Sequence, residues 1–279
     1  MNAGLATAIE QATGARVVGT APVGGGSTSH GVAVTLDDGE RLFAKHTPGA
    51  PPGLFRGEAA GLAWLAEAGS VRVPDVVAVD DDWLVLEWID EGSRSAATDE
   101  QLGRAIARMH RAGADAFGAP WPGFAGSVPV PNEPGSDWPS FLAERRLLPI
   151  ARAAGLPDGM MHRLEALIPR LPDLLGPPEP PSRLHGDLWA GNHMTDANGR
   201  PVLIDCDAYG GHREVDIAMM LLFGGFGDRV IAAYDEEFPL APGWRDRVEL
   251  NQLLPLLVHC AMLGGSWFAR TDAVLRGAT

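Results

Sequence analysis

The hydrophobic pattern of this chain changes in kind near residue 91. Up to that point, short segments carry the alternation of apolar and polar residues that is typical of β-strands. These segments are residues 15–20, 31–36, 41–46, 76–79 and 83–88. Asp37, Asp38 and Gly39 separate two of them and predict a hairpin. Beyond residue 91, helical spacing dominates. Strands followed by helices predict an α+β fold with a small antiparallel sheet and a larger, mainly helical part.

The same pattern predicts two lobes, residues 1–90 and residues 91–279. Within the first lobe, one helix is expected over 55–68, before Gly69. In the second lobe, Thr98 is expected to cap a helix that ends near Gly113. Further helices are predicted over 137–153, 160–168, 215–223, 228–237 and 244–263, with short strands over 183–185, 193–195 and 201–204. A ligand cleft is expected between the lobes.

Composition excludes several classes of partner. The chain has 279 residues, 46% of them apolar, and no apolar run reaches the roughly 18 residues that cross a bilayer. A net charge of −14 without a Lys/Arg cluster argues against nucleic acid. Cys206 and Cys260 show no metal or disulfide spacing, and the N-terminus has no signal-peptide pattern. We therefore expect a cytoplasmic protein without membrane contact, as a monomer or a weak dimer.

Residues 184–216 hold the polar groups that phosphoryl transfer requires. The reaction needs a carboxylate to accept a hydroxyl proton, oxygen ligands for Mg²⁺, and cations for the phosphates of ATP. Asp187, in the sequence His185-Gly186-Asp187, is the candidate catalytic carboxylate. Asn192 follows five residues later and Asp205 ends an apolar strand, and this oxygen pair suits Mg²⁺.

Groups that could bind the phosphates of ATP are found in the first lobe. Gly24, Gly25, Gly26 and Ser27 lie between two predicted strands, where free backbone N–H groups can approach phosphates. The same residues could also form an ordinary hairpin turn. Lys45 lies on a following strand, and Glu58 lies on the predicted helix, where it can orient the lysine.

Lys45 is the only lysine among 22 Lys and Arg residues. Surface solvation and ion pairing accept either residue type, so a chain that uses Arg elsewhere retains lysine where a compact ammonium is required. If the lysine were placed at random among these positions, it would fall at the predicted phosphate site about one time in 22. This observation is independent of the motif at 184–216.

Two sequence segments allow a family to be recognised. HGDLWAGN at 185–192 and VLIDCDAYGGHREVDIAMMLLFGGF at 202–226 resemble the fructosamine kinase (ketosamine 3-kinase) family, within the aminoglycoside phosphotransferase-like and protein-kinase-like kinases. The resemblance covers nearly the whole chain. It implies a two-lobed kinase fold and ATP-dependent phosphorylation of a sugar hydroxyl on a fructosamine- or ribulosamine-type ketoamine, free or protein-bound. The phosphorylated adduct is labile, so the reaction promotes deglycation.

The resemblance also implies individual roles. Asp187 would be the catalytic base, Asn192 and Asp205 the Mg²⁺ ligands, and Lys45 with Glu58 the phosphate-positioning pair. Residues Glu87, Trp88 and Ile89 would form the hinge that meets adenine, and Asp216 would brace the catalytic loop.

The chain departs from the family pattern beside the predicted metal site. The family commonly has Asp-Pro-Ala, whereas this chain has Asp205, Cys206 and Asp207. Asp207 either adds a metal ligand or faces solvent, and a small buried thiol is the favoured role of Cys206. Tyr209-Gly210 replaces an expected tyrosine pair.

Acceptor recognition is expected to involve several residues that the ATP motifs do not use. Trp189 either stacks on the acceptor or anchors the loop. Tyr209, His212, Arg213 and Glu214 are expected to line the pocket, although the last three could instead form surface pairs at a helix entry. A helical insert near residues 121–138 is the other candidate.

Three rival functions are open at the level of sequence. Gly186-Asp187 and Gly191-Asn192-His193 resemble fragments of metallophosphoesterase motifs, but no upstream Asp-x-His supplies further ligands. A kinase of aminoglycosides, choline or another small alcohol would use the same ATP residues. A nucleotide-binding module without catalysis is the third, and the full set of five core residues argues against it.

Overall fold

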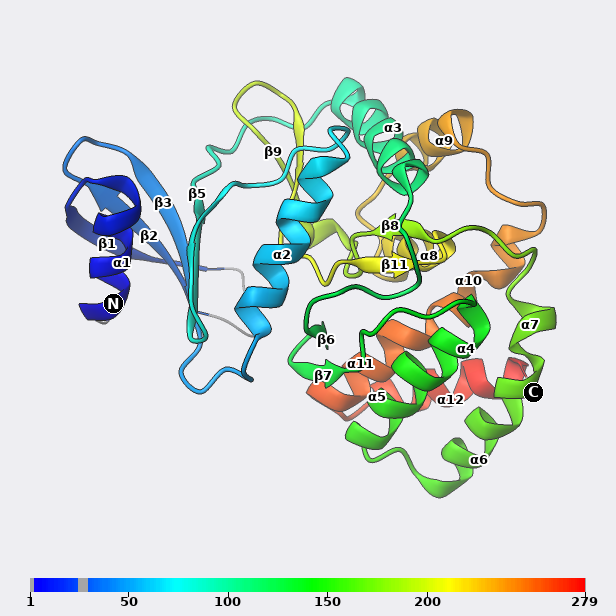
Figure 1. Cartoon of the computed structure of the whole chain (residues 1–279). Coiled ribbons are helices and arrows are strands. Elements are labelled where there is room, and N and C mark those ends of the chain that lie inside the picture. The colour runs from blue at the N-terminus through cyan, green and yellow to red at the C-terminus, as the bar shows by residue number, and fades with distance from the viewer. Residues whose placement is uncertain (1–2, 25–29, 279) are drawn as a thin grey trace.

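Five antiparallel strands form the sheet of the small lobe, in the order β1-β2-β3-β5-β4. The computed structural model describes residues 3–24 and 30–278 (Figure 1). The strands are β1 (Val17–Val23), β2 (His30–Leu36), β3 (Arg41–His46), β4 (Val76–Val79) and β5 (Trp83–Glu87). The predicted α+β fold is thus confirmed, with helices dominating the rest of the chain.

Two helices pack on opposite faces of this sheet, α1 (Ala3–Thr13) and α2 (Leu54–Glu67). The alternation of side chains along β5 explains the arrangement, since successive residues of a strand point to opposite faces. Trp83 and Val85 pack in the cluster that contains α1, whereas Leu84 and Leu86 pack in the cluster that contains α2. All four are buried, as expected of a strand covered on both sides.

Helix α1 is an addition to the single helix expected in this lobe. Its sequence offers only Leu5 and Ile9 as large buried residues, one helical turn apart. A short helix with so few apolar positions has little stability of its own and depends on tertiary packing. Here both side chains pack with Val34, Leu42 and Trp83 of the sheet.

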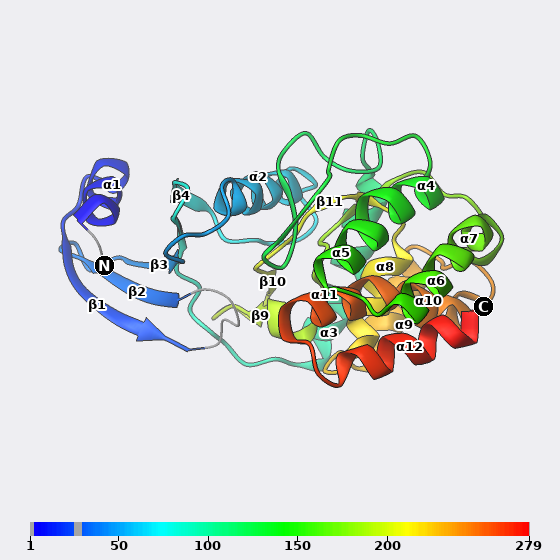
Figure 2. The ribbon, with the colours of Figure 1, turned by 90° about the horizontal axis from the view of Figure 1, so that it is seen from below.

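Helix α2 lies between the sheet and the large lobe in both views (Figures 1 and 2). Glycines permit the close approach. A Cβ on Gly57 would lie 2.7 Å from the Pro122 carbonyl oxygen, and one on Gly61 would lie 3.0 Å from Ala208 Cβ. The apolar core is continuous across this seam, because Leu62 of α2 belongs to the same buried cluster as Leu188 of the large lobe.

The large lobe begins with α3 (Ala96–Ala112), which packs beside α9 (Asp228–Glu237). Ser95 is the N-cap of α3 rather than the predicted Thr98. Its hydroxyl accepts a hydrogen bond from Thr98 N at 3.1 Å, and the Thr98 hydroxyl accepts one from Ser95 N at 3.2 Å. Thr98 is therefore the third residue of a capping box.

The remaining helices of the large lobe lie below α3 in the view of Figure 1. They are α4 (Trp138–Leu142), α5 (Leu148–Ala153), α6 (Asp158–Leu167), α7 (Leu171–Leu174), α8 (Glu214–Leu222), α10 (Val248–Asn251), α11 (Leu253–Leu263) and α12 (Trp267–Ala278). A π-helical turn, Ala143–Leu147, joins α4 to α5, so the helix predicted over 137–153 is continuous but not regular. Helix α12 was not predicted. None of the helices in the described part of the chain is long and apolar enough to cross a membrane.

The segment near 121–138, expected to be a helical insert, forms a hairpin instead. Strand β6 (Gly123–Ala125) pairs with β7 (Val128–Val130) through Gly126 and Ser127. A Cβ on Gly123 would lie 2.7 Å from the Asn132 side chain, and Gly126 has a φ of 59°. These glycines allow a tight hairpin that larger residues would prevent.

Two short strand pairs hold the polar motif of residues 184–216. Strand β8 (Ser182–Leu184) pairs with β11 (Tyr209–Gly211), and β9 (His193–Thr195) pairs with β10 (Pro201–Leu203). The loop 185–192 therefore runs from β8 to β9, and the loop 204–208 runs from β10 to β11. Because both loops join the same two pairs, they lie side by side. The Ile204 N–H donates to the Asn192 carbonyl at 3.0 Å, and the Asp207 N–H donates to the His185 carbonyl at 3.0 Å.

Candidate active site

Buried hydrogen bonds fix the backbone of the loop 185–192. One carboxylate oxygen of Asp216 accepts the His185 N–H at 2.7 Å, and the other accepts the Gly186 N–H at 3.0 Å. Asp216 is fully buried at the start of α8 and also contacts His110 Nε2 at 3.1 Å. This geometry is the brace that the family resemblance implied for Asp216.

His185 has a structural position in the same loop. Burial lowers the pKa of its ring, so the neutral ring donates from Nε2 to the Ile204 carbonyl at 3.0 Å. Its Nδ1 accepts the Asp187 N–H at 3.3 Å. The imidazole therefore fixes the start of the loop 204–208 and the backbone of Asp187.

Asn192 connects Asp187 to Asp205. Its Nδ2 donates to Asp187 Oδ2 at 2.8 Å, to the Asp187 carbonyl at 2.9 Å and to the Asp205 carbonyl at 3.1 Å. All of these bonds use the amide nitrogen, so among the residues that the structure describes the Asn192 amide oxygen is left as an acceptor. Burial, followed by the charge of Asp205, raises the pKa of Asp187 to about 7.

Lys45 reaches the same place from the small lobe. On β3, Leu42 and Ala44 face α1, so Lys45 points toward α2. Its Nζ lies 2.6 Å from Glu58 Oε1 and 2.6 Å from Asp205 Oδ1. Burial alone would lower the pKa of Lys45, but the two carboxylates outweigh burial and raise it, so the ammonium stays charged.

Asp205 adopts an unusual backbone conformation. Its φ of 59° is the one positive φ among the described non-glycine residues. Such conformations cost about 1–3 kcal/mol and are concentrated at functional sites. Its carboxylate is half exposed, whereas Lys45 is buried and Glu58 is nearly so. The strained backbone thus presents a carboxylate to open space beside the lysine.

Three carboxylates of this site line a cleft of about 660 Å³. Its lining includes Glu58 and Asp187 with Asp205, together with the predicted acceptor residues Trp189 and Tyr209. Trp189 is 37% exposed and meets Phe223 edge to face, with ring centroids 6.0 Å apart. The tryptophan is therefore free to contact a ligand while one edge is held by the protein.

The predicted nucleotide contacts are only partly described. Gly24 directly follows β1, whereas Gly25, Gly26 and Ser27 lie outside the described residues. Glu87 ends β5 and accepts a hydrogen bond from Arg72 at 2.5 Å. Trp88 donates from Nε1 to Asp90 at 3.0 Å, and Ile89 is buried. The segment 87–89 links the two lobes but does not line the 660 Å³ cleft.

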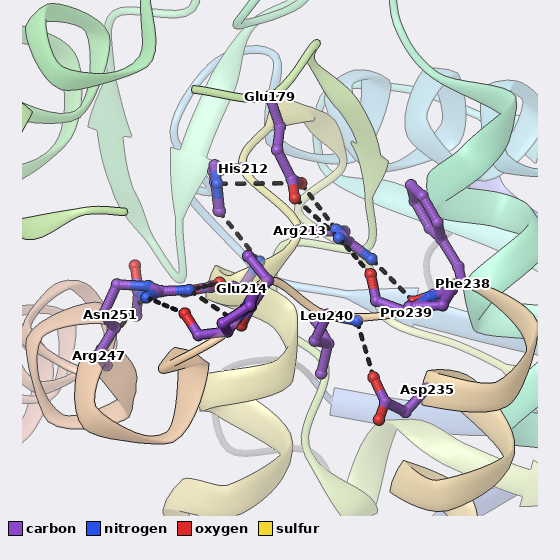
Figure 3. A network of polar contacts seen from close by, with 12 residues as sticks. Glu179, His212, Arg213, Glu214, Asp235, Phe238, Pro239, Leu240, Arg247 and Asn251 are labelled. Carbon is purple, nitrogen blue, oxygen red and sulfur yellow. Dashed lines mark hydrogen bonds and ion pairs between the residues drawn. The ribbon is translucent and has the colours of Figure 1, made fainter. Parts of the chain in front are cut away.

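His212, Arg213 and Glu214 are not among the residues that line the cleft, contrary to their expected place. Figure 3 shows the polar network to which they belong. Arg213 forms a bidentate ion pair with Glu179, with both distances 2.7 Å, and donates to the Phe238 and Pro239 carbonyls. Glu214 forms a bidentate pair with Arg247 at 2.6 and 2.9 Å. All three residues are buried. They join α8 to the segment before β8 and to the segment after α9. Their contacts therefore stabilise the fold and do not face the cleft.

Two charged residues that line the cleft, Asp207 and Arg146, were not assigned to the acceptor from the sequence. Asp207 lines it, and burial, followed by the charge of Asp187, raises the pKa of this carboxyl above its ordinary range. Arg146, in the π-helical turn, also lines the cleft, with its guanidinium 4.2 Å from the Tyr209 ring centroid. The sequence signal for Asp207 was its departure from the family motif. No local pattern marks Arg146, because its place depends on the π-helical turn.

Cys206 has the buried position that was favoured. Its Sγ packs against α2, where a Cβ on Gly61 would lie 3.1 Å away. Burial raises the pKa of this thiol well above its ordinary value, so it remains protonated.

The fold and this site define a phosphotransferase of the protein-kinase-like class, in which a strand lysine bonded to a helix glutamate meets the Asp205 carboxylate beside the loop 185–192. Comparison with known proteins supports and narrows this class. A family model described as fructosamine kinase matches residues 1–278. The chain therefore belongs to the fructosamine kinase family.

Individual relatives agree with this placement. A protein of Synechocystis sp. provisionally named a ketoamine kinase is 32% identical over 285 residues, covering 98% of this chain and 95% of the relative. The chloroplastic protein-ribulosamine 3-kinase of Arabidopsis thaliana is 32% identical over 264 residues, covering 91% of this chain and 80% of the relative.

Solved structures give the same result. A crystal structure from Thermobifida fusca, provisionally described as a fructosamine-3-kinase, has a TM-score of 0.90 and 43% identity, with 98% of each chain covered. The choline kinase LicA of Streptococcus pneumoniae has a TM-score of 0.68 at 14% identity, over 98% of this chain and 97% of that one, which is a likeness of fold alone. The chain is an ATP-dependent kinase by family.

Proposed function

We propose that the protein transfers the γ-phosphoryl group of ATP to a sugar hydroxyl of a ketoamine of the fructosamine or ribulosamine type. The observation that carries the proposal is the contact of Lys45 with both Glu58 and Asp205, beside the bonded pair Asp187 and Asn192. Membership of the fructosamine kinase family and relatives named for ketoamines and ribulosamines support the choice of acceptor.

Asp187 is assigned as the general base. Its carboxylate lines the cleft and is held by Asn192, so it can accept the proton of a hydroxyl that enters from the acceptor side. The hydroxyl oxygen then forms a bond to the γ-phosphorus while the bond from that phosphorus to the β,γ-bridging oxygen breaks. ADP leaves with the electron pair of the broken bond.

The residues present fit a magnesium ion. The free amide oxygen of Asn192 and the exposed carboxylate of Asp205 are hard oxygen donors, and Mg²⁺ binds few protein ligands beside water and phosphate oxygens. When bound, the ion neutralises charge on the phosphates. Lys45 would contact the same phosphates, with Glu58 orienting it.

Residues 1–90 are assigned to nucleotide binding and residues 91–279 to catalysis and acceptor binding. Gly24, Gly25, Gly26 and Ser27 would approach the phosphates, and Glu87, Trp88 and Ile89 would meet adenine. Trp189 and Tyr209 are assigned to the acceptor side, because both line the cleft with Asp187. The phosphorylated ketoamine would then release its amine, which makes the reaction a deglycation.

A panel of acceptors tests the proposal. ADP formation is measured with ribulosamines, fructosamines, an aminoglycoside and choline, and the phosphorylated hydroxyl is located by NMR. We expect turnover with a ketoamine at a kcat/KM at least 100-fold above that for the other two acceptors. Preferred turnover of choline or the aminoglycoside would refute the ketoamine assignment and leave the kinase class intact.

A further inference from the structure

Asp207 is held in a fixed orientation between the catalytic loop and the β6–β7 hairpin. Its N–H donates to the His185 carbonyl at 3.0 Å, and its Oδ2 accepts the Gly126 N–H at 2.9 Å. It also contacts the loop closely, because a Cβ on Gly186 would lie 2.0 Å from the Asp207 carbonyl oxygen. Asp187 and Asp207 therefore belong to one packed unit.

The second carboxylate oxygen of Asp207 is free to bind a ligand. Within the described residues Oδ1 has no hydrogen-bond partner, and it is not among the buried unpaired atoms, so it is open to the cleft. The other carboxylates of the cleft are engaged: Glu58 and Asp205 bind Lys45, and Asp187 binds Asn192. Asp207 forms no ion pair with any described residue.

Arg146, the arginine that lines the cleft within the described residues, forms no ion pair with Asp207. The Arg146 guanidinium donates to the Pro131 carbonyl and to Asn132 Oδ1, each at 2.6 Å, and stacks on Tyr209. Asp187 and Asp205 line the same cleft, so a cation delivered by the ligand would meet several carboxylates there.

Aromatic side chains line the cleft around these carboxylates. The Trp121 indole N–H donates to the carbonyl of Ala208, next to Asp207, at 3.1 Å, and the ring lines the cleft. Trp189 adds a second ring, which is 37% exposed. Aromatic faces beside a carboxylate favour an organic cation over a hydrated metal ion.

We propose that Asp207 binds the protonated amine nitrogen of the acceptor while Asp187 receives the reacting hydroxyl. The inference rests on the proposed function and extends it to substrate recognition. In a ketoamine that is phosphorylated at its third carbon, the nitrogen is bonded to the first carbon, so three carbon atoms separate the two polar groups. A rigid unit carrying both aspartates can hold both ends of this short segment. The alternative, Asp207 as a further metal ligand, is less favoured because the Gly126 N–H holds its carboxylate at the β6–β7 hairpin, whereas the Asp205 carboxylate is held at Lys45.

A pair of matched acceptors tests the proposal. One is a 1-deoxy-1-alkylamino ketose, and the other is the corresponding 1-O-alkyl ketose, in which a neutral ether oxygen replaces the nitrogen. The wild-type enzyme should favour the amine by at least about 10-fold in kcat/KM. Asp207→Asn, which keeps an oxygen for the Gly126 N–H, should lower kcat/KM for the amine about 10- to 100-fold, the usual range for a charged hydrogen bond. The ether should change less than about 3-fold, and so should KM for ATP.

Asp207→Ala, which restores the residue common in the family, should repeat this selective loss. Asp137→Asn is the matched control, since Asp137 also accepts one backbone N–H, from Ser140 at 3.0 Å, but does not line the cleft. Equal losses for both acceptors, or a raised Mg²⁺ requirement, would overturn the proposal, the second outcome indicating a metal ligand.

Failure of the proposed function is distinguishable from failure of this inference. If the wild type phosphorylates no ketoamine, the proposed function fails. If it phosphorylates the amine and the ether equally well, the function stands and the inference fails. Calorimetric binding of the two acceptors to the wild type and to Asp207→Asn adds a readout without turnover, and equal affinities for amine and ether would again reject the inference.

Discussion

The Lys45 ammonium on β3 donates a 2.6 Å hydrogen bond to the Asp205 carboxylate, which lies 160 positions later in the chain. Lys45 is buried, and its other partner is Glu58 at 2.6 Å. The site therefore accepts a compact ammonium at the end of a flexible stem. A planar guanidinium of the same charge cannot fit between two carboxylates at these distances without displacing one.

We accordingly expect Lys45→Arg to lower kcat/KM by about 100-fold or more, because a positioned cation on the phosphates is lost. Steady-state kinetics with saturating ATP measure the loss. Arg16→Lys, the reverse change at an exposed ion pair with Asp37, should leave activity unchanged. If kcat/KM of Lys45→Arg stayed within about 3-fold of the wild-type value, activity would not require a lysine at this position.

Asp187→Ala should reduce kcat by about 10²–10⁴-fold, the usual contribution of a general base. The affinity for ATP should stay within about 3-fold, because the role proposed for Asp187 is to act on the acceptor hydroxyl and not on the nucleotide. Calorimetric titration with ATP separates the two effects. Near-normal turnover in this variant would exclude Asp187 as the base.

Asp216→Ala should destabilise the protein, because three groups lose their buried partner. These are the N–H groups of His185 and Gly186 and the ring of His110. Removing one member of a buried charged network costs about 3–5 kcal/mol. Urea unfolding at neutral pH measures this change, and an unaltered midpoint would mean that Asp216 does not brace the loop.

Arg213→Ala tests whether the network of Figure 3 is structural. Its guanidinium binds Glu179 and two backbone carbonyls outside the cleft. The variant should lose about 3–5 kcal/mol of stability, while kcat and KM of the remaining folded enzyme stay near the wild-type values. A large rise in KM for the acceptor without loss of stability would restore the substrate role expected from the sequence.

The pH dependence of stability offers a second test of this network. The hydrogen bonds and charge of Arg213 outweigh burial and lower the pKa of Glu179 below its ordinary value of 4.5. Glu179 therefore stabilises the fold above its unfolded pKa, and that contribution is lost as the pH falls through the lower folded value. Glu179→Gln should be less stable than the wild type at pH 7, with a difference that shrinks below about pH 4.5. A difference independent of pH would contradict the ion pair.

The strands of the small lobe were predictable because their sequence pattern is local. The bounds expected for β3 and β4 match the structure, and so do those of α9. Helix α1 was not predictable in the same way, since Leu5 and Ile9 become a helix face only when the sheet is present. The β6–β7 hairpin likewise depends on glycines that fit against distant residues such as Asn132.

Some residues of the candidate site could likewise be identified from the sequence, and others could not. Asp187 and Asn192 lie in one loop, so their spacing already implied proximity, and Lys45 was identified by its rarity. The orientation of His212 and Arg213 was not contained in their motif. Entry into α8 turns them toward Glu179, which is remote in sequence, and only the packed structure reveals which way they point.

Helix α2 is packed tightly between the two lobes. A Cβ at Gly57 or Gly61 would meet Pro122 or Ala208 of the large lobe, and Leu62 of α2 shares a buried cluster with Leu84 and Leu86 of the sheet. For the same reason a fragment that ends at residue 90 would expose Phe55 and Leu62 to water. Heating should accordingly melt the whole molecule in one cooperative step.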